Sequence, residues 1–149
     1  MTSPIDGIIW DWIGTIYERN KGLYPWSRKV LVGLKQHYRF GLVTIAKHGI
    51  LKRREELEET GVLHLFDSVI IDTIKTPEHY LRCMREMGTA PERTAIVDDR
   101  TIRGIKIGNQ LGFPTFWIQK GEYALEIPNE ETGDPTYRIN TIEDLLELL

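Results

Sequence analysis

The sequence predicts a three-layer α/β domain, in which helices cover both faces of a central, mostly parallel sheet of five strands. Three observations predict this fold class. Short apolar runs alternate with amphipathic segments along the chain, as expected of β-α-β units. The length of 149 residues suits a single domain, 1–149, with one sizeable core. Hydrophobic residues make up 41% and charged residues 28% of the chain, which is ordinary for a globular protein.

Five short apolar runs predict the strands. Each is bounded by polar or turn-forming residues and is too short for a helix, so a buried strand is the better interpretation. The runs cover residues 8–10, 41–45, 68–71, 94–97 and 115–118. A polar loop at 119–136 follows the last of them, and residues 137–139 are compatible with a short extra strand.

Amphipathic segments between these runs predict the helices. Val30 and Leu34 lie on one face of the first helix, which begins near residue 26. Thr76 followed by Pro77 is typical of a helix start, and Gly61 is typical of a helix end. The other expected helices cover 52–60, 101–111 and 141–149, the last capped by Thr141.

The charge balance limits the classes of partner. The formal net charge is −3, which argues against a protein that mainly grips nucleic acid or an anionic membrane. A local basic pocket remains compatible with this balance. Cys83 is the only cysteine, so no internal disulfide can form, and its helical neighbours predict a packing role. Residues 1–6 resemble no signal peptide, so we expect a cytoplasmic protein without a membrane span.

Polar side chains follow four of the predicted strands. Asp11 ends the first strand, Thr44 lies near the end of the second, Lys75 follows the third, and Asp98 and Asp99 end the fourth. Ligands of parallel α/β sheets bind beyond the carboxyl ends of the strands. We therefore expect these side chains to meet at one edge of the sheet.

This set of side chains suits phosphoryl transfer. A carboxylate such as Asp11 can attack phosphorus and form an aspartyl-phosphate. Lys75 and Thr44 can stabilise the negative charge of the transferred group. Mg²⁺ prefers oxygen ligands and can bridge Asp11, Asp99 and the phosphate.

Each residue alone has an ordinary structural explanation: Asp98 and Asp99 can cap the next helix, and Lys75 can be a solvated surface lysine. Their joint occurrence in this order favours a site.

The motifs as a whole resemble the haloacid dehalogenase superfamily. Residues 8–15 (IIWDWIGT) are similar to its first motif, 42–44 (LVT) to its second, 75–77 (KTP) to its third, and 95–99 (AIVDD) to its fourth. The resemblance spans nearly the whole chain. It implies a Rossmann-like fold, Asp11 as nucleophile, Thr44 and Lys75 as phosphate-binding residues and Mg²⁺ as cofactor. The implied metal ligands are Asp11, Asp99, the backbone carbonyl of Ile13 and, adjacent to them, Asp98.

Receiver domains of response regulators combine similar residues, but in another order. They place the acidic pair on the first strand and the lysine last. Here the acidic pair, Asp98 and Asp99, follows Lys75. The order of the motifs therefore favours the haloacid dehalogenase resemblance.

The sequence departs from the family pattern at two positions. Ile13 stands where the phosphatases of the family carry a second Asp, the general acid and base. Such a group contributes about 10²–10⁴-fold in rate, so we expect weakened or unusual activity. Gly104 stands where the fourth motif usually carries another carboxylate, a group whose loss typically costs about 10–100-fold in metal affinity or activity.

No segment after the first or second motif is long enough for a cap insertion. Residues 16–24 and 45–74 leave no room for one. We therefore expect an open site that takes a phosphorylated, bulky or macromolecular substrate, or that a second subunit closes. The missing cap argues against the phosphonoacetaldehyde hydrolases and dehalogenases that share this form of the first motif. Lys47, His48 and Arg100 are candidate substrate contacts, with ordinary loop residues as the alternative.

Two functional hypotheses follow. The favoured one is a Mg²⁺-dependent phosphohydrolase that acts through Asp11. The alternative is an impaired relative that binds metal or a phosphorylated partner without turning it over. The intact Asp11, Thr44 and Lys75 favour the first hypothesis, whereas Ile13 and Gly104 are the departures that favour the second.

Overall fold

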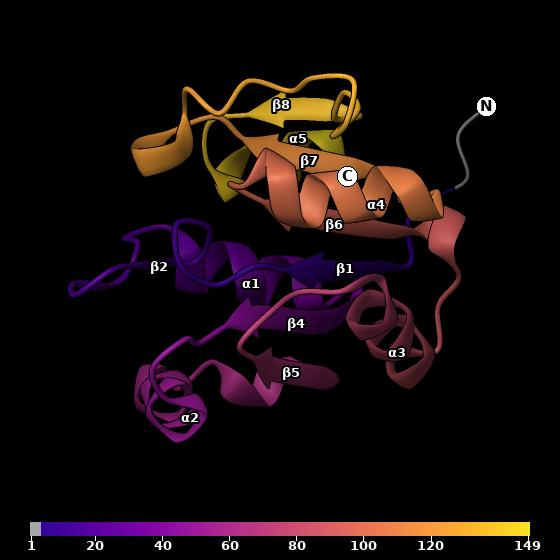
Figure 1. Cartoon of the computed structure of the whole chain (residues 1–149). Coiled ribbons are helices and arrows are strands. Elements are labelled where there is room, and N and C mark those ends of the chain that lie inside the picture. The colour runs from indigo at the N-terminus through magenta and orange to yellow at the C-terminus, as the bar shows by residue number, and fades with distance from the viewer. Residues whose placement is uncertain (1–3) are drawn as a thin grey trace.

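The computed structural model describes residues 4–149 (Figure 1). Residues 1–3, on which part of the signal-peptide expectation rests, lie outside the described residues. A six-stranded sheet in the order β5-β4-β1-β6-β7-β8 forms the middle of the molecule, and all its neighbouring strands pair in parallel. Its strands are β1 (Gly7–Trp10), β4 (Arg39–Ile45), β5 (Ser68–Asp72), β6 (Thr94–Asp98), β7 (Thr115–Ile118) and β8 (Tyr137–Ile139).

The α/β fold class predicted from the sequence is therefore confirmed, with one correction. The sheet has six strands instead of five, because β8 pairs with β7 along its whole length and becomes the edge of the sheet. Only Ile139 of its three residues is buried. A three-residue run with so little apolar surface gives only a weak signal in the sequence.

Side chains of the central strands alternate between two cores, as the pleat of a strand requires. Ile8 and Trp10 enter the larger core, whereas Ile9 faces the smaller one. The helices α1, α2 and α5 contribute to the larger core, and α3 and α4 to the smaller. The sheet is thus the middle layer of three, as Figure 1 shows. The helices are α1 (Ser27–Lys35), α2 (Ile50–Thr60), α3 (Pro77–Met87), α4 (Lys106–Leu111) and α5 (Leu145–Leu148).

Two of the predicted helices are interrupted. A π-helical turn, Thr101–Ile105, takes the first half of the segment expected to form one helix before α4. A single 3-10 turn, Ile142–Asp144, precedes the short α5. Three other 3-10 turns connect elements of the sheet and the helices: Leu63–Leu65, Pro91–Arg93 and Gly121–Tyr123.

The predicted helix ends agree with the structure. The hydroxyl of Thr76 accepts a hydrogen bond from the backbone N–H of His79, and Thr141 caps the last helical segment in the same manner. Gly61 ends α2 in the left-handed conformation, at φ 75°. These local signals set where the elements begin and end, and so fix the loops that carry the polar residues.

A small antiparallel hairpin between β1 and α1 is absent from the sequence prediction. It consists of β2 (Tyr17–Glu18) and β3 (Gly22–Leu23), and Asn20 in its turn has a φ of 64°. The ring of Tyr17 stacks on Trp12 with 5.3 Å between ring centroids. The hairpin is thereby tied to the loop that leaves the first strand.

The packing role expected of Cys83 is confirmed. Cys83 is fully buried in the smaller core, as a packing residue should be. Trp10, Trp12 and Trp117 are fully buried as well, so they pack in the interior. None of the helices within residues 4–149 is both long and apolar enough to cross a membrane.

Candidate active site

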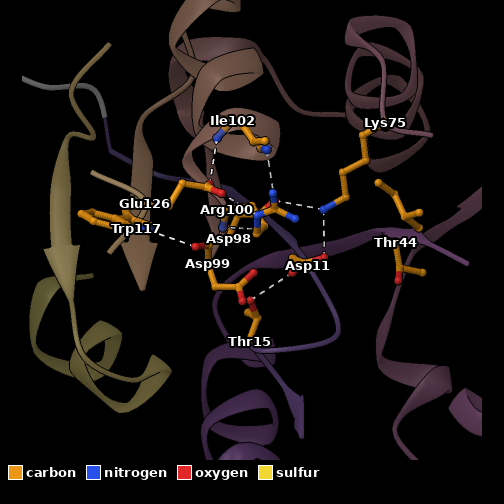
Figure 2. Close-up of polar contacts among 12 residues, drawn as sticks. Asp11, Thr15, Thr44, Lys75, Asp98, Asp99, Arg100, Ile102, Trp117 and Glu126 are labelled. Atoms are coloured by element: carbon orange, nitrogen blue, oxygen red, sulfur yellow. Dashed lines mark hydrogen bonds and ion pairs between the residues drawn. The ribbon is translucent and has the colours of Figure 1, made fainter. Parts of the chain in front are cut away.

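The polar residues that follow the strands lie together at one edge of the sheet. Since β5, β4, β1 and β6 are consecutive neighbours, their carboxyl ends bring Lys75, Thr44, Asp11 and Asp99 to one pocket. The backbone N–H of Asp11 also bonds to the carbonyl of Val97 at 3.0 Å, which ties the end of β1 to β6. Figure 2 shows how these side chains converge.

Lys75 is the central cation of this group. Its Nζ lies 2.8 Å from Oδ1 of Asp11 and 2.9 Å from Oδ2 of Asp98, and its side chain is only 3% exposed. Burial alone would lower the pKa of Lys75, but the two carboxylates outweigh it and hold that pKa well above its usual value. Lys75 therefore stays charged. The alternative of a solvated surface lysine is wrong.

Asp98 lies beneath the pocket and holds the lysine. It is fully buried, and its Oδ1 accepts the backbone N–H of Arg100 at 3.0 Å. Its Oδ2 accepts Lys75 Nζ and the backbone N–H of Gly104, the latter at 3.1 Å. Both oxygens are thus already engaged. The capping role considered for Asp98 is real, since it bonds two backbone N–H groups of the turn, and it coexists with the bond to Lys75.

Gly104 makes room for this carboxylate. A Cβ at position 104 would lie 2.3 Å from Oδ2 of Asp98, closer than any real contact permits. The family pattern places another carboxylate at position 104. In this chain the carboxylate of Asp98, the last residue of β6, occupies the space that a side chain at 104 would need.

Asp99 and Asp11 form the acidic floor of the pocket. Burial and the charges of Asp11 and Asp98 raise the pKa of Asp99 to about 10. The nearby Gly14 has a φ of 82°, and a Cβ at this position would lie 2.1 Å from Oδ2 of Asp99. The carboxyl group of Asp99 is thus held close to Asp11 and Asp98, and its hydrogen bond with the Asp98 side chain contributes to the raised pKa.

This crowding has the chemistry of a divalent-cation site. One oxygen each of Asp11, Asp98 and Asp99 lies within 4.8 Å of the others. Burial and the charge of Asp98 raise the pKa of Asp11, although Lys75 opposes the shift. Three close carboxylates are stable together only when protons or a cation offset their charge. Asp11 and Asp99 line the pocket, whereas Asp98 lies beneath it with both oxygens engaged. Oδ1 of Asp11 accepts from Lys75 at 2.8 Å, and its Oδ2 accepts from the hydroxyl of Thr15 at 3.4 Å.

Arg53 joins the site although the sequence analysis did not select it. Its Nη1 donates to Oγ1 of Thr44 at 2.5 Å and to the carbonyl of Ile45 at 2.9 Å. Glu56, one turn further along α2, pairs with Arg53 and accepts the indole N–H of Trp12 at 2.8 Å. Because the Thr44 oxygen accepts from Arg53, its own hydrogen is free to donate into the pocket. The i, i+3 spacing of Arg53 and Glu56 is visible in the sequence, but their contacts with Thr44 and Trp12 are not.

The candidate substrate contacts lie at the same pocket. Lys47 and His48 are exposed and line it, as does Ile13. Arg100 also lines it, but its Nε pairs with Glu126 at 2.9 Å and its guanidinium stacks 3.8 Å from the ring centre of Tyr123. Arg100 is thus committed to holding the segment after β7, whereas Lys47 and His48 are free to meet a ligand.

Glu126 and Trp117 fix the far side of the site, as Figure 2 shows. The indole N–H of Trp117 donates to the carbonyl of Asp99 at 3.0 Å. Glu126 accepts from the hydroxyl of Thr101 at 3.0 Å and from the backbone N–H of Ile102 at 3.2 Å. Both contacts hold the chain around Asp99, and neither has a motif in the sequence that would predict it.

Comparison with known protein families shows what this chain is similar to. A family model described as haloacid dehalogenase-like hydrolase matches residues 7–118. The match runs from β1 through β7 and therefore includes all the strand-end residues described above. A comparison with curated protein sequences gave no significant match.

Solved structures share the fold. A haloacid dehalogenase-superfamily phosphatase from Thermococcus onnurineus is 25% identical with a TM-score of 0.71; the match covers 85% of this chain and 58% of that one. An uncharacterised Listeria monocytogenes protein is 15% identical with a TM-score of 0.81, and the match covers 97% of this chain and 96% of that one. The putative hydrolase YfnB of Bacillus subtilis, solved with magnesium, is 21% identical, with a TM-score of 0.73 and coverage of 86% and 56%. This chain thus spans little more than half the length of two of the three.

Proposed function

Because this chain belongs to the haloacid dehalogenase-like hydrolase family, we propose that it is a Mg²⁺-dependent phosphohydrolase with Asp11 as its nucleophile. One observation carries the proposal: the buried cation Lys75 lies between Asp11 and Asp98, and the carboxyl group of Asp99 lies beside Asp11. A nucleophilic carboxylate, a fixed cation and a metal-binding carboxylate are the groups that this reaction requires.

In the first step the carboxylate of Asp11 attacks phosphorus. A bond forms between an Asp11 oxygen and phosphorus, and the bond from phosphorus to the leaving oxygen breaks. Lys75 stays charged next to Asp11, so it can hold a phosphoryl oxygen while charge develops. The hydroxyl of Thr44, held from behind by Arg53, supplies a second donor.

In the second step water attacks the phosphoryl group on Asp11. Inorganic phosphate leaves and the carboxylate is restored. Mg²⁺, held by Asp11, Asp99 and the carbonyl of Ile13, would supply neutralisation of the phosphate charge. The apolar side chain of Ile13 lines the pocket and offers no proton to the leaving oxygen and no base to the water. We therefore expect slow turnover that favours good leaving groups.

An open site is part of the proposal. Only the β2–β3 hairpin lies between β1 and α1, so no cap domain covers the pocket from that insertion point. This supports a phosphorylated substrate over the small halogenated acids of capped dehalogenases. A subunit that closes the site from outside remains compatible with it.

A phosphatase screen with Mg²⁺ tests the proposal, with Asp11→Asn as the matched control. Aryl and acyl phosphates should be hydrolysed faster than alkyl phosphates, because their leaving groups need little protonation. Asp11→Asn should reduce turnover to background. An acid-quenched reaction should show phosphate bound covalently to Asp11 by mass spectrometry. Turnover that survives Asp11→Asn would contradict the assignment.

Ile13 supports a second candidate function. Without a general acid or base, the same pocket can bind a metal and a phosphorylated partner without consuming it. In that case Mg²⁺ and phosphate should raise the melting temperature together. No phosphate ester should be hydrolysed, and no adduct on Asp11 should form.

A further inference from the structure

The pocket above Asp11 contains more positive charge than one phosphate needs. Its volume is about 460 Å³, which suits a small molecule. Three carboxylates line it: Asp11, Glu56 and Asp99. Seven cationic side chains line it as well: Arg19, Lys47, Lys52, Arg53, Lys75, Arg100 and Arg103. A chain with a net charge of −3 therefore places seven of its 19 Lys and Arg residues at this one pocket.

Three of the seven cations are already engaged by the protein. Lys75 pairs with Asp11 and Asp98, Arg53 with Glu56, and Arg100 with Glu126. The other four have no ion pair and no side-chain hydrogen bond anywhere in residues 4–149; these are Arg19, Lys47, Lys52 and Arg103.

The four free cations reach the pocket from three separate segments. Arg19 lies in the turn of the β2–β3 hairpin, next to Asn20, which has the left-handed conformation. Lys47 and Lys52 flank the start of α2, and Arg103 belongs to the π-helical turn. These cations repel one another. Burial, and to a smaller extent the charge of Arg19, lowers the pKa of Arg53, which lies at the same pocket. An anion between these segments would relieve that repulsion.

We propose that the substrate carries a second phosphate in addition to the one that Asp11 attacks. The inference rests on the proposed function, since Lys75, Thr44 and a bound metal serve the first phosphate. The free cations then serve the second, at the outer part of the pocket. The pocket volume favours a bisphosphorylated small molecule over a nucleic-acid chain.

Binding measurements on the Asp11→Asn protein test the pocket without turnover. The probes are α,ω-alkanediol bisphosphates of three to six carbons, each compared with the alkyl monophosphate of equal length, by calorimetry with Mg²⁺ present. At least one bisphosphate should bind about tenfold more tightly than its monophosphate, and the advantage should shrink as salt rises. If no bisphosphate binds more tightly than its monophosphate, the inference is overturned.

Single substitutions locate the second phosphate. Lys47→Gln and Lys52→Gln should each reduce the preference for the bisphosphate about two- to fivefold, the size of an exposed ion pair. Lys29→Gln is the matched control, because Lys29 is an exposed helix lysine that does not line the pocket. An equal loss of preference in Lys29→Gln would overturn the inference, as would an undiminished preference in both pocket variants.

Three further outcomes separate this inference from the proposed function and from a nucleic-acid substrate. Bisphosphate preference in a protein that hydrolyses no phosphate ester would overturn the proposed function and keep the second anion site. Turnover with equal kcat/KM on monophosphates and bisphosphates would do the reverse. Tighter binding of a 5′-phosphorylated decanucleotide than of any bisphosphate would overturn the small-molecule class.

Discussion

The carboxylate of Asp98 packs directly against the Cα of Gly104, so no side chain fits at position 104. Gly104→Ala places a Cβ 2.3 Å from Oδ2 of Asp98 and 2.9 Å from its Cβ. The carboxylate must then move and give up its bonds to Lys75 and to the backbone of the turn. We expect a loss of about 1–3 kcal/mol in the free energy of unfolding, measured by urea denaturation.

Gly33→Ala is the matched control for that substitution. A Cβ at position 33 meets nothing within 4 Å, and Gly33 lies inside α1. Alanine there should leave stability unchanged or raise it by about 0.5–1 kcal/mol, because glycine is a poor helix former. If Gly104→Ala is as stable as Gly33→Ala, the packing of Asp98 against position 104 is not as described.

Ile13 is the residue on which catalytic efficiency depends. Ile13→Asp places a carboxyl group at the pocket, where it can protonate the leaving oxygen and activate water. Turnover of phosphate esters should rise by about 10²-fold or more, measured as kcat on aryl and alkyl phosphates.

Ile13 also packs against the larger core, so the substitution carries a cost in stability. Thermal melting measures that cost separately, and Ile13→Asn controls for polarity without a titratable group. A folded Ile13→Asp protein with no gain over Ile13→Asn would show that the missing carboxyl is not what limits the reaction.

The sequence could predict single residues where a motif and a strand end coincide, and not elsewhere. Asp11, Lys75 and Asp99 follow apolar runs, so their convergence was foreseeable from topology. The roles of Arg53 and Glu126 were not, because each acts through a contact with a distant segment. Gly104 looked like a missing carboxylate, because the sequence cannot show that Asp98 fills its space.

At the scale of an element, the start of α3 presents Lys75 to the site. Thr76 caps α3, and its backbone N–H also donates to Nδ1 of His79, whose Nε2 lies 2.9 Å from Asp72. The network links the end of β5 to the first turn of α3 across the lysine loop. It therefore fixes the backbone from which Lys75 extends.

Thr76→Ala should cost about 1 kcal/mol of stability and also lower kcat. Thr141→Ala is the control, because Thr141 caps the last helical segment by the same motif without a link to Lys75. Both variants should lose similar stability in urea, and only Thr76→Ala should lose kcat. Equal kcat in the two variants would show that the cap does not position the lysine.

Element boundaries were predictable where local chemistry sets them. The apolar strands and the caps at Thr76 and Thr141 appear in the sequence because short-range patterns determine them. The β2–β3 hairpin has only two residues in each strand, too few for a period to be visible. No local sequence pattern marks the π-helical turn either. Its backbone N–H groups donate to Asp98 and Glu126, which lie outside the turn.

At the scale of the whole molecule, charge is divided between interior and rim. Asp11 and Asp99 form the floor of the pocket with Asp98 beneath them, and the four free cations line the same pocket. Net charge alone left a local basic pocket possible and could not locate it. The floor attracts a cation and the rim attracts an anion, so metal and phosphate should bind with positive coupling.

The pH dependence of stability tests the acidic floor. In the metal-free protein the pKa of Asp99 is raised to about 10, mainly by burial and then by Asp11 and Asp98, whereas in the unfolded chain it is about 3.9. Between these values the folded state holds a proton that the unfolded state lacks. Stability from this group is therefore full below about pH 4 and falls as pH rises toward 10, by at most about 1.4 kcal/mol per pH unit.

Mg²⁺ should reverse this trend, because a metal binds the ionised carboxylate and displaces the proton. Urea denaturation from pH 5 to 9 should show falling stability without Mg²⁺ and a Mg²⁺-dependent gain that grows with pH. Asp99→Asn mimics the protonated carboxyl, so it should flatten the metal-free decline and abolish the gain. Asp134→Asn, outside the pocket, is the control and should keep both the metal-free decline and the Mg²⁺-dependent gain. A Mg²⁺ gain that persists in Asp99→Asn would remove this residue from the metal site and leave Asp98 with Asp11 to hold the ion.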